Sequence, residues 1–270
     1  MQNYYSLTHP QKRIWYIEKL YPDTPIYNIG GPIRIKGPVN FKLLEKSINI
    51  LVKKNEGLRL RFTQRNGEAF QYVSEYNWHN LDVLDFSSYK NPEEELNKWI
   101  EKAAKTPFLI ENERLFYFAL FKIAEDDNGY FVKFHHIISD GWSINIMTEQ
   151  ICSTYMKLLR DEEIDDSSEN SYIDYIERER EYLASERFLK NKNYWNNKYD
   201  KLPDTLLNKV SDTIEGKRKT SRLSEELSLK VKKFAEDNKV SLNTFFVSLF
   251  LIYLYKTTQV DDIIIGTPVL

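Results

Sequence analysis

The segment Phe134–Ser143, with the sequence FHHIISDGWS, gathers residue types that can carry out proton-transfer chemistry. It contains two of the four histidines of the 270-residue chain, followed by an aspartate and a glycine. An imidazole can take up and return a proton near neutral pH, and a neighbouring carboxylate can fix the imidazole tautomer. Three interpretations are open from these residues: a catalytic constellation, a metal site and a polar turn.

The spacing of the two histidines limits how they can cooperate. Successive side chains of a strand point to opposite faces, so His135 and His136 are not expected to serve one reacting atom together. We expect one to be catalytic and the other structural. Gly141 would let the backbone approach a ligand or adopt a positive φ. A helix beginning near Ser143 would bring unpaired N–H groups that can stabilise an oxyanion.

Metal binding is the first alternative, because His135, His136 and Asp140 are all possible ligands. Adjacent histidines of a strand diverge, however, and the other two histidines lie in unrelated contexts. The chain also lacks a CxxC pair. No metal is therefore predicted. The polar turn stays open, because an Asp-Gly pair is by itself common in turns.

The neighbouring sequence predicts the elements that position this motif. Leu115–Ile123 and Tyr130–His135 are apolar, aromatic-rich runs separated by the turn residues 125–129, which indicates two central strands. The residues after the motif place apolar side chains on one helical stripe, which comprises Ile144, Met147, Ile151, Tyr155 and Leu158. Ser143 stands where a helix cap is expected. The motif is thus predicted at a strand-to-helix turn.

The rest of the first half is predicted to alternate between strands and helices. Strands are expected at Tyr27–Lys36, Leu58–Phe62 and Glu68–Val73, and helices from Phe41 and from Pro92. Asn66-Gly67 between the second and third strands is typical of a two-residue hairpin turn. Asn91, Pro92 and three following glutamates give a strong helix start.

The second half begins after an acidic, polar segment. Asp161–Ser171 has few large apolar groups and indicates a linker, so we place a lobe boundary there. The elements predicted beyond it are helices over Tyr172–Leu189 and Lys190–Tyr199, a short strand over Lys219–Leu223, helices capped by Ser224 and Ser241, and, within Val260–Leu270, a final strand that runs into a Gly-Thr-Pro turn. The helix after Ser241 is apolar all round and is therefore expected to be deeply buried.

Composition excludes several classes of function. Lys and Arg total 38 against 40 Asp and Glu, and the net charge of −2 gives no basic field for nucleic acid. Cys152 is the only cysteine, so no internal disulfide can form and a reducing, cytoplasmic location is predicted. The polar N-terminus lacks a signal peptide core, and the most apolar run, Phe245–Tyr255, is shorter than the ~20 residues of a membrane span.

In this setting, the HHxxxDG pattern resembles the signature of the acyltransferase superfamily that includes chloramphenicol acetyltransferase and the condensation domains of nonribosomal peptide synthetases. The following Trp142-Ser143 favours a condensation domain. Ser6, Gln11, Arg13 and Trp15 are similar to that family's opening motif, SxAQxRLWxL.

Two later regions extend the resemblance. Glu56, Leu58, Arg59 and Phe62 match the second motif, RHExLRTxF, although Asn55 replaces its histidine and Leu60 its threonine. Tyr172, Asp174 and Tyr175 are similar to the fourth motif, YxDFAxW, and residues 265–269, IGTPV, match the start of the fifth.

The resemblance implies an α/β protein of the chloramphenicol acetyltransferase-like class, a two-layer α/β sandwich with a mixed sheet. Residues 1–165 would form the N-terminal lobe that carries HHxxxDG, and residues 166–270 would begin a similar, incomplete second lobe. In a whole domain, the active site would lie in a tunnel between the two lobes.

The implied reaction is amide-bond formation, in which a carrier-bound acceptor amine attacks a carrier-bound donor thioester. The partners would be donor and acceptor peptidyl carrier proteins and an adenylation domain. Substrates would arrive on 4′-phosphopantetheine arms, and no cofactor would be bound by the chain itself. The same resemblance leaves open an epimerisation domain, a free-standing coenzyme A acyltransferase and a non-catalytic carrier-docking fragment.

The resemblance also implies roles for single residues. His136 would be catalytic beside a structural His135, with Gly141 next to the reacting centre. Asp140 would orient the loop through an arginine, for which Arg13, Arg59, Arg61 and an arginine beyond Leu270 are candidates. Arg13, Arg59, Trp142 and Ser143 would contact substrate. The alternative is that the arginines are ordinary surface residues and that Trp142 belongs to the core.

Overall fold

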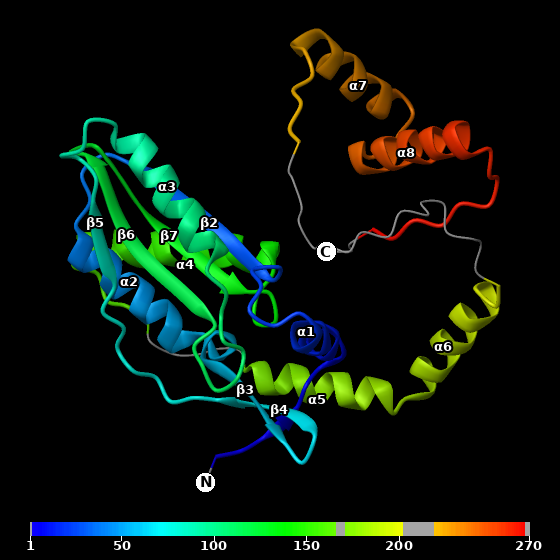
Figure 1. Cartoon of the computed structure of the whole chain (residues 1–270), viewed down its shortest axis with the longest axis horizontal. Coiled ribbons are helices and arrows are strands. Elements are labelled where there is room, and N and C mark those ends of the chain that lie inside the picture. Colours follow the sequence, from blue (N-terminus) through cyan, green and yellow to red (C-terminus); the bar gives the residue numbers. More distant parts are fainter. Residues whose placement is uncertain (1, 166–170, 202–218, 268–270) are drawn as a thin grey trace. The chain divides into compact units, whose positions relative to one another are not determined.

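The computed structural model describes residues 2–165, 171–201 and 219–267. Its contacts divide the chain into two compact units, Met1–Leu189 and Lys190–Leu270. The strands are β1 (Tyr5–Ser6), β2 (Asn28–Lys36), β3 (Leu60–Arg65), β4 (Glu68–Val73), β5 (Asp82–Asp85), β6 (Phe116–Ala124) and β7 (Asp127–His135). The helices are α1 (His9–Leu20), α2 (Phe41–Lys54), η1 (Glu56–Arg59), α3 (Pro92–Lys105), α4 (Gly141–Leu159), α5 (Tyr172–Leu183), α6 (Glu186–Lys198), α7 (Glu225–Asp237) and α8 (Leu242–Thr258) (Figure 1).

The first unit is built on a four-stranded sheet in the order β2-β7-β6-β5. β5 runs parallel to β6 and the other pairs are antiparallel, so the predicted mixed sheet is confirmed. β2 is an edge strand, where Pro32 can sit without costing an interior ladder bond. Gly30 in β2 has a φ of +135°, and a Cβ there would overlap the carbonyl oxygen of Val132 on β7. Close pairing at this point of the sheet therefore requires glycine.

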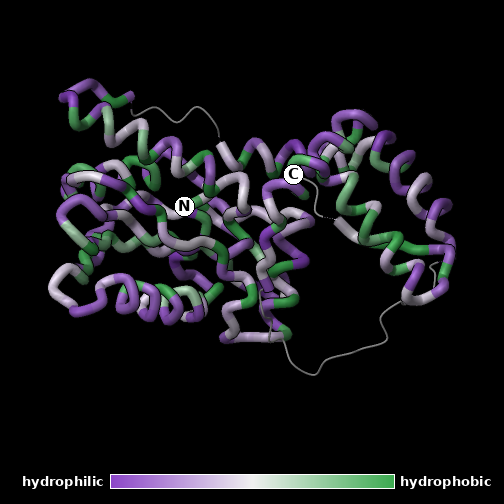
Figure 2. The backbone as a smooth tube through the Cα atoms, turned by 90° about the horizontal axis from the view of Figure 1, so that it is seen from above, coloured by the Kyte–Doolittle hydropathy of each residue, from purple (hydrophilic) through white to green (hydrophobic). Residues whose placement is uncertain are grey.

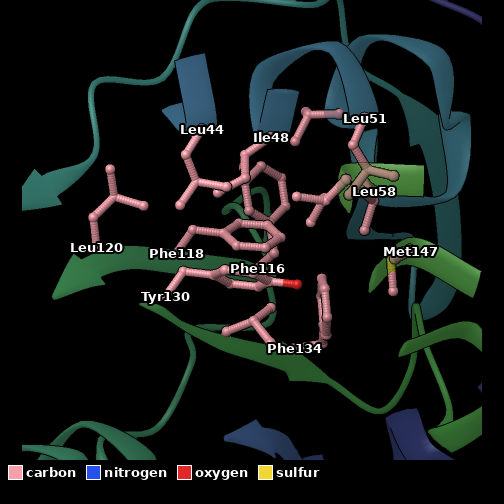
Figure 3. Packing of buried hydrophobic residues seen from close by; sticks show 13 residues of the cluster. Leu44, Ile48, Leu51, Leu58, Phe116, Phe118, Leu120, Tyr130, Phe134 and Met147 are labelled. Carbon is pink, nitrogen blue, oxygen red and sulfur yellow. The ribbon is translucent and has the colours of Figure 1, made fainter. Parts of the chain in front are cut away.

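Helices α2 and α4 cover one face of this sheet (Figure 3). Leu44, Ile48 and Leu51 of α2 pack against aromatic side chains of β6 and β7, among them Phe118 and Phe134. Met147 and Ile151 of α4 complete the cluster, which confirms the predicted stripe. Because side chains alternate along a strand, every second residue of the two central strands points to this face, and their aromatic residues form its core.

Helix α3 covers the opposite face, where Trp99 meets Phe131 edge-on with ring centroids 5.2 Å apart. Lys133 points to the same face and is buried, and its ammonium group donates to the carbonyl oxygens of Ala103 and Thr106 at the end of α3. Burial lowers the pKa of Lys133 to about 8. Helices thus cover the sheet on both faces.

A second, three-stranded sheet, in the order β1-β4-β3, carries the predicted hairpin. Asn66 and Gly67 both have positive φ, 50° and 85°, as a two-residue hairpin turn requires. Trp15 of α1 and Phe62 of β3 lie in one buried cluster with Ile137, the residue after the two histidines. This cluster joins α1 and the small sheet to the end of β7.

Helix α5 belongs to the first unit by its hydrogen bonds. The Glu56 carboxylate accepts from the Ser171 hydroxyl at 2.6 Å and from the Tyr172 N–H at 3.0 Å, which holds the start of α5 against η1. The contacts divide the chain after Leu189. The predicted boundary between the two lobes lies after residue 165, and it stays a prediction. Residues 166–170 of the predicted linker lie outside the described residues.

The second unit confirms two predicted helix starts. Ser224 accepts from the Leu227 N–H and Ser241 from the Thr244 N–H, so both serines cap their helices. Helices α7 and α8 pack through Phe234. No single helix in the described part of the chain is long and apolar enough to cross a membrane, although α7 and α8 together meet the length and composition criteria as a pair bent by 102°.

Four predictions for the second half are wrong. Hydrophobic residues run along α8 (Figure 2), yet most are exposed, for example Tyr253 at 60%, because α7 supplies most of the packing on it within the described unit. Residues 219–223 and 260–267 form no strand, since no neighbouring strand in the described residues pairs with them. The end of that segment, residues 268–270, lies outside the described residues. The helix predicted over 172–189 breaks at residues 184–185 between α5 and α6.

Candidate active site

Backbone hydrogen bonds fix the turn that follows β7. The His135 N–H donates to the carbonyl of Leu115 at 2.9 Å, and the His136 N–H donates to the carbonyl of Tyr27 at 2.8 Å. The Ile138 N–H then donates back to the His135 carbonyl at 3.1 Å. The two histidines are therefore held between β6 and the segment that leads into β2, and the chain turns at once toward α4.

His135 is buried, with 2% of its surface exposed, and lies between the rings of Tyr27 and Phe108. Its Nδ1 accepts the N–H of Ile137 at 3.2 Å, which places the proton of the neutral ring on Nε2. Nε2 faces the buried Glu18 carboxylate of α1 at 3.5 Å, a contact longer than an ordinary hydrogen bond. His135 is thus enclosed in the interior of the first unit.

His136 is exposed, in contrast to its neighbour. The structure therefore confirms that the two imidazoles diverge. Gly141 is also exposed, and a Cβ there would meet no atom within 4 Å. Its φ is not positive, so that predicted reason for the glycine is wrong, while the close approach of a ligand stays a prediction. The open space beside Gly141 leaves room for a ligand near the turn.

Asp140, and not Ser143, is the N-cap of α4. Its Oδ1 accepts from the Ser143 N–H at 2.7 Å and from the Ser143 hydroxyl at 2.6 Å. These hydrogen bonds, aided by the His136 imidazole, hold the pKa of Asp140 below its usual value. The predicted cap at Ser143 is wrong by three residues, because its side chain donates to the cap. The Ser143 N–H is also no longer free for an oxyanion.

The arginines predicted to pair with Asp140 point elsewhere. Arg59 donates to the Ser74 carbonyl at 3.0 Å and Arg61 to the Leu60 carbonyl at 2.8 Å, while Arg13 is exposed on α1. In the described ranges no arginine lies within salt-bridge distance of Asp140. The substrate contacts predicted for Arg13 and Arg59 therefore stay predictions, and the structure does not bring these residues to the turn.

Trp142 is 61% exposed on the first turn of α4, so it is not a core residue of the first unit. It stands beside Gly141 and Ser143 on the same turn. The turn thus presents one exposed imidazole and one exposed indole, with a capped helix behind them. Among the described residues no three His, Cys, Asp or Glu side chains gather as metal ligands.

Comparison with known proteins places this fold and turn in a family. The model of the Condensation domain family matches residues 1–270. The chain belongs to the condensation-domain family. It is 35% identical over 273 residues to one of the subunits of plipastatin synthase and 34% identical over 271 residues to surfactin synthase subunit 1, both of Bacillus subtilis (strain 168). These matches cover 97% and 98% of the chain, but only 10% and 8% of the two relatives.

Solved structures show the same fold. The first condensation domain of the calcium-dependent antibiotic synthetase, in complex with a substrate analogue, has a TM-score of 0.84 at 21% identity, covering 97% of this chain and 63% of that one. The starter condensation domain of a rhizomide synthetase has a TM-score of 0.71 at 23% identity, covering 76% and 50%. The chloramphenicol acetyltransferase-like α/β class is thereby confirmed.

The family's opening motif has a structural reason here. The side-chain amides of Gln11 on α1 and Gln71 on β4 are buried and hydrogen bond to each other at 2.8 and 2.9 Å. The Gln11 oxygen also accepts the Thr8 N–H, and its nitrogen lies 3.5 Å from the carbonyl oxygen of Ile137. Gln11, which lies far from the histidines in sequence, therefore contacts the turn that carries them.

Glu18 is the residue of this site that sequence reasoning missed. It lies on the buried face of α1 with Gln11 and Trp15, at spacings of four and three residues. That spacing places all three on one side of a helix, and a carboxylate on such a face requires a partner. The available signal was an acidic residue at a position where a buried apolar side chain is expected. Its partner, His135, becomes visible only in the folded chain.

Proposed function

We propose that this chain acts in amide-bond formation by a nonribosomal peptide synthetase. The observation that carries the proposal is the exposed His136 on a turn that the buried His135 and the Asp140 cap hold in place. The family match and the synthetase relatives support the same reaction class. Since the chain spans about a tenth of those relatives or less, the activity, substrates and partners of a whole synthetase are part of the proposal.

In the proposed reaction, the nitrogen of an acceptor amine attacks the carbonyl carbon of a donor thioester. A C–N bond forms, the C–S bond breaks and the thiol leaves. The proton lost by the attacking nitrogen passes to His136 and from there to the departing sulfur. An α-amino group has a pKa of about 7.7–8.0, so deprotonating it beforehand costs only about 1 kcal/mol near neutral pH. His136 therefore acts on the nitrogen as it becomes cationic, where a general base typically contributes about 10²–10⁴ in rate.

The proposal assigns the other predicted site residues and partners as follows. Gly141 gives the acyl group access to the turn, and Trp142 and Ser143 lie along its path, while Arg13 contacts substrate farther away. Donor and acceptor peptidyl carrier proteins present the substrates on 4′-phosphopantetheine, and an adenylation domain selects the amino acid. A cytoplasmic location fits a chain with a single cysteine.

The test replaces His136 by alanine in the protein that the natural reading frame encodes. The variant is supplied with a donor-loaded and an acceptor-loaded carrier protein. We expect amide product to fall at least about 100-fold, which is the lower end of general-base assistance. His9→Ala is the matched control, because His9 is also exposed and lies on the same unit. Product formation by the His136 variant at the wild-type rate would refute the assigned role.

The comparisons do not favour an epimerisation domain or a non-catalytic docking fragment. The same assay separates them: an epimerase would invert the α-carbon of a carrier-bound residue without forming an amide. A docking fragment would bind carrier without turnover in any variant.

A further inference from the structure

A small polar pocket lies beside the β3–β4 hairpin, at the segment that follows β4. It has a volume of about 280 Å³, near the lower end of the ~300–1,000 Å³ range of small-ligand sites. Its lining comprises Arg59, Arg61, Tyr72, Ser74, Glu75, Tyr76, Asn77, His79 and Asn112. Two cationic side chains thus share one cavity with amides and hydroxyl groups, and the only acid in the lining, Glu75, is exposed.

The guanidinium groups in this pocket are poorly satisfied by the protein. Arg59 donates from Nη1 to the Ser74 carbonyl, and its Nε is buried with no hydrogen-bond partner. Arg61 donates from Nη1 to the Leu60 carbonyl. A guanidinium has five N–H donors, so most of these donors have no acceptor among the described residues. Within residues 2–165, 171–201 and 219–267, neither group forms a salt bridge with a carboxylate.

A third arginine adds to the positive charge. Nη1 of Arg114 lies 3.0 Å from Nδ1 of His79, and the His79 ring packs edge-on against Phe116. Burial, with the nearby charges of Arg114 and Arg61, lowers the pKa of His79, so its ring is neutral at pH 7. Burial also lowers the pKa of Arg61. The nearby charge of Arg114 lowers this pKa further, whereas that of Glu113 raises it.

Half-buried cations without a salt-bridge partner cost free energy, because desolvation is not offset by a direct ion pair. Arginine stays charged in such surroundings, and its planar fork matches the oxygens of phosphate groups. We infer that this pocket binds the phosphate group of a small ligand, with Arg59 and Arg61 as the cationic contacts. The remaining volume and the rings of Tyr72 and Tyr76 fit an organic substituent, so a phosphate ester is favoured over the free ion.

The proposal is tested by calorimetric titration and thermal unfolding of the full chain with inorganic phosphate and, separately, with phenyl phosphate. Sodium chloride at matched ionic strength is the reference. We expect saturable binding, tighter for the ester, and a rise in Tm above that in chloride. Tighter binding of the free ion would assign the site to inorganic phosphate instead. A Tm that follows ionic strength alone would overturn the proposal.

Variants of one arginine locate the site. Arg61→Gln is expected to weaken binding at least tenfold, while leaving or raising the Tm without phosphate, because it removes an unpaired charge. Arg65→Gln is the matched control, since Arg65 is exposed on the same hairpin and stacks over Tyr4. Arg61→Lys keeps the charge but loses the fork, so weakened binding by this variant supports the proposal even if Arg61→Gln does not fold. Equal affinity of the Arg61 and Arg65 variants would overturn it.

Discussion

Asp140 provides the sharpest test of how the candidate site is built. The structure assigns its carboxylate to capping α4 through Ser143, whereas the family resemblance predicts an ion pair with an arginine. Asp140→Asn separates the two, because asparagine caps a helix about as well as aspartate but carries no charge. Asp140→Ala removes both the cap and the charge.

The two roles differ in magnitude. Losing an N-cap costs about 0.5–2 kcal/mol, and losing a charge near the start of a helix costs about 0.3–1 kcal/mol. Leaving a buried partner cation unpaired would cost about 3–5 kcal/mol. We therefore expect Asp140→Ala to lower the free energy of unfolding by about 1–2 kcal/mol and Asp140→Asn by less than about 1 kcal/mol.

Urea unfolding of the two variants and the wild type measures these differences. Asn40→Ala is the matched control, because Asn40 caps α2 in the same unit by accepting the Leu43 N–H at 3.2 Å, away from the histidines. It should cost the cap contribution alone, about 0.5–2 kcal/mol, without reducing amide formation. A loss of about 3 kcal/mol or more in Asp140→Asn would refute the capping assignment and favour a charged partner.

The pH dependence carries a further check on the same residue. Because the hydrogen bonds from Ser143 lower the pKa of Asp140 in the folded chain, its contribution is complete above its ordinary pKa. The contribution is lost as the pH falls through the lowered value. The stability difference between the wild type and Asp140→Asn should therefore shrink in acid, and a difference that stays constant down to about pH 2 would contradict the capping geometry.

Three further predictions concern the scaffold. Gly30→Ala should destabilise the first unit by more than about 2 kcal/mol in urea unfolding, because the added Cβ would meet the β7 backbone at a residue with positive φ. Gly31→Ala should be nearly neutral, because a Cβ at Gly31 would meet no atom within 4 Å. Similar losses in the two variants would contradict the strand register. Between about pH 8 and pH 10.5 the free energy of unfolding of the wild type should rise, relative to that of Lys133→Met, by up to about 3 kcal/mol. The reason is that Lys133 binds its proton more tightly in the unfolded chain than in the folded one. Parallel pH profiles of stability for the two proteins would exclude this. Glu18→Ala should cost about 1–3 kcal/mol, because it removes the buried carboxylate that faces His135 Nε2 at 3.5 Å, and Glu18→Gln, which keeps a polar group there, should cost less; a larger loss in Glu18→Gln would contradict this.

The sequence alone determined the features that depend on neighbouring residues. The two aromatic strands, the hairpin at Asn66-Gly67, the caps at Ser224 and Ser241 and the strand-to-helix position of His136 all follow from local patterns. Side-chain alternation in a strand and the first turn of a helix involve only a few consecutive residues, so they can be predicted without knowing the fold. The opposite directions of the two histidines are of this kind.

Only the tertiary structure decided which distant groups meet. The Glu18 partner of His135, the amide pair beneath the turn and the cavity that joins Arg59, Arg61 and His79 depend on how separate elements pack. A local pattern can mark a buried polar residue, but it cannot name the residue that satisfies it. The same limit explains the wrong predictions beyond residue 218, where burial of an apolar helix and pairing of a strand require neighbours outside the local sequence.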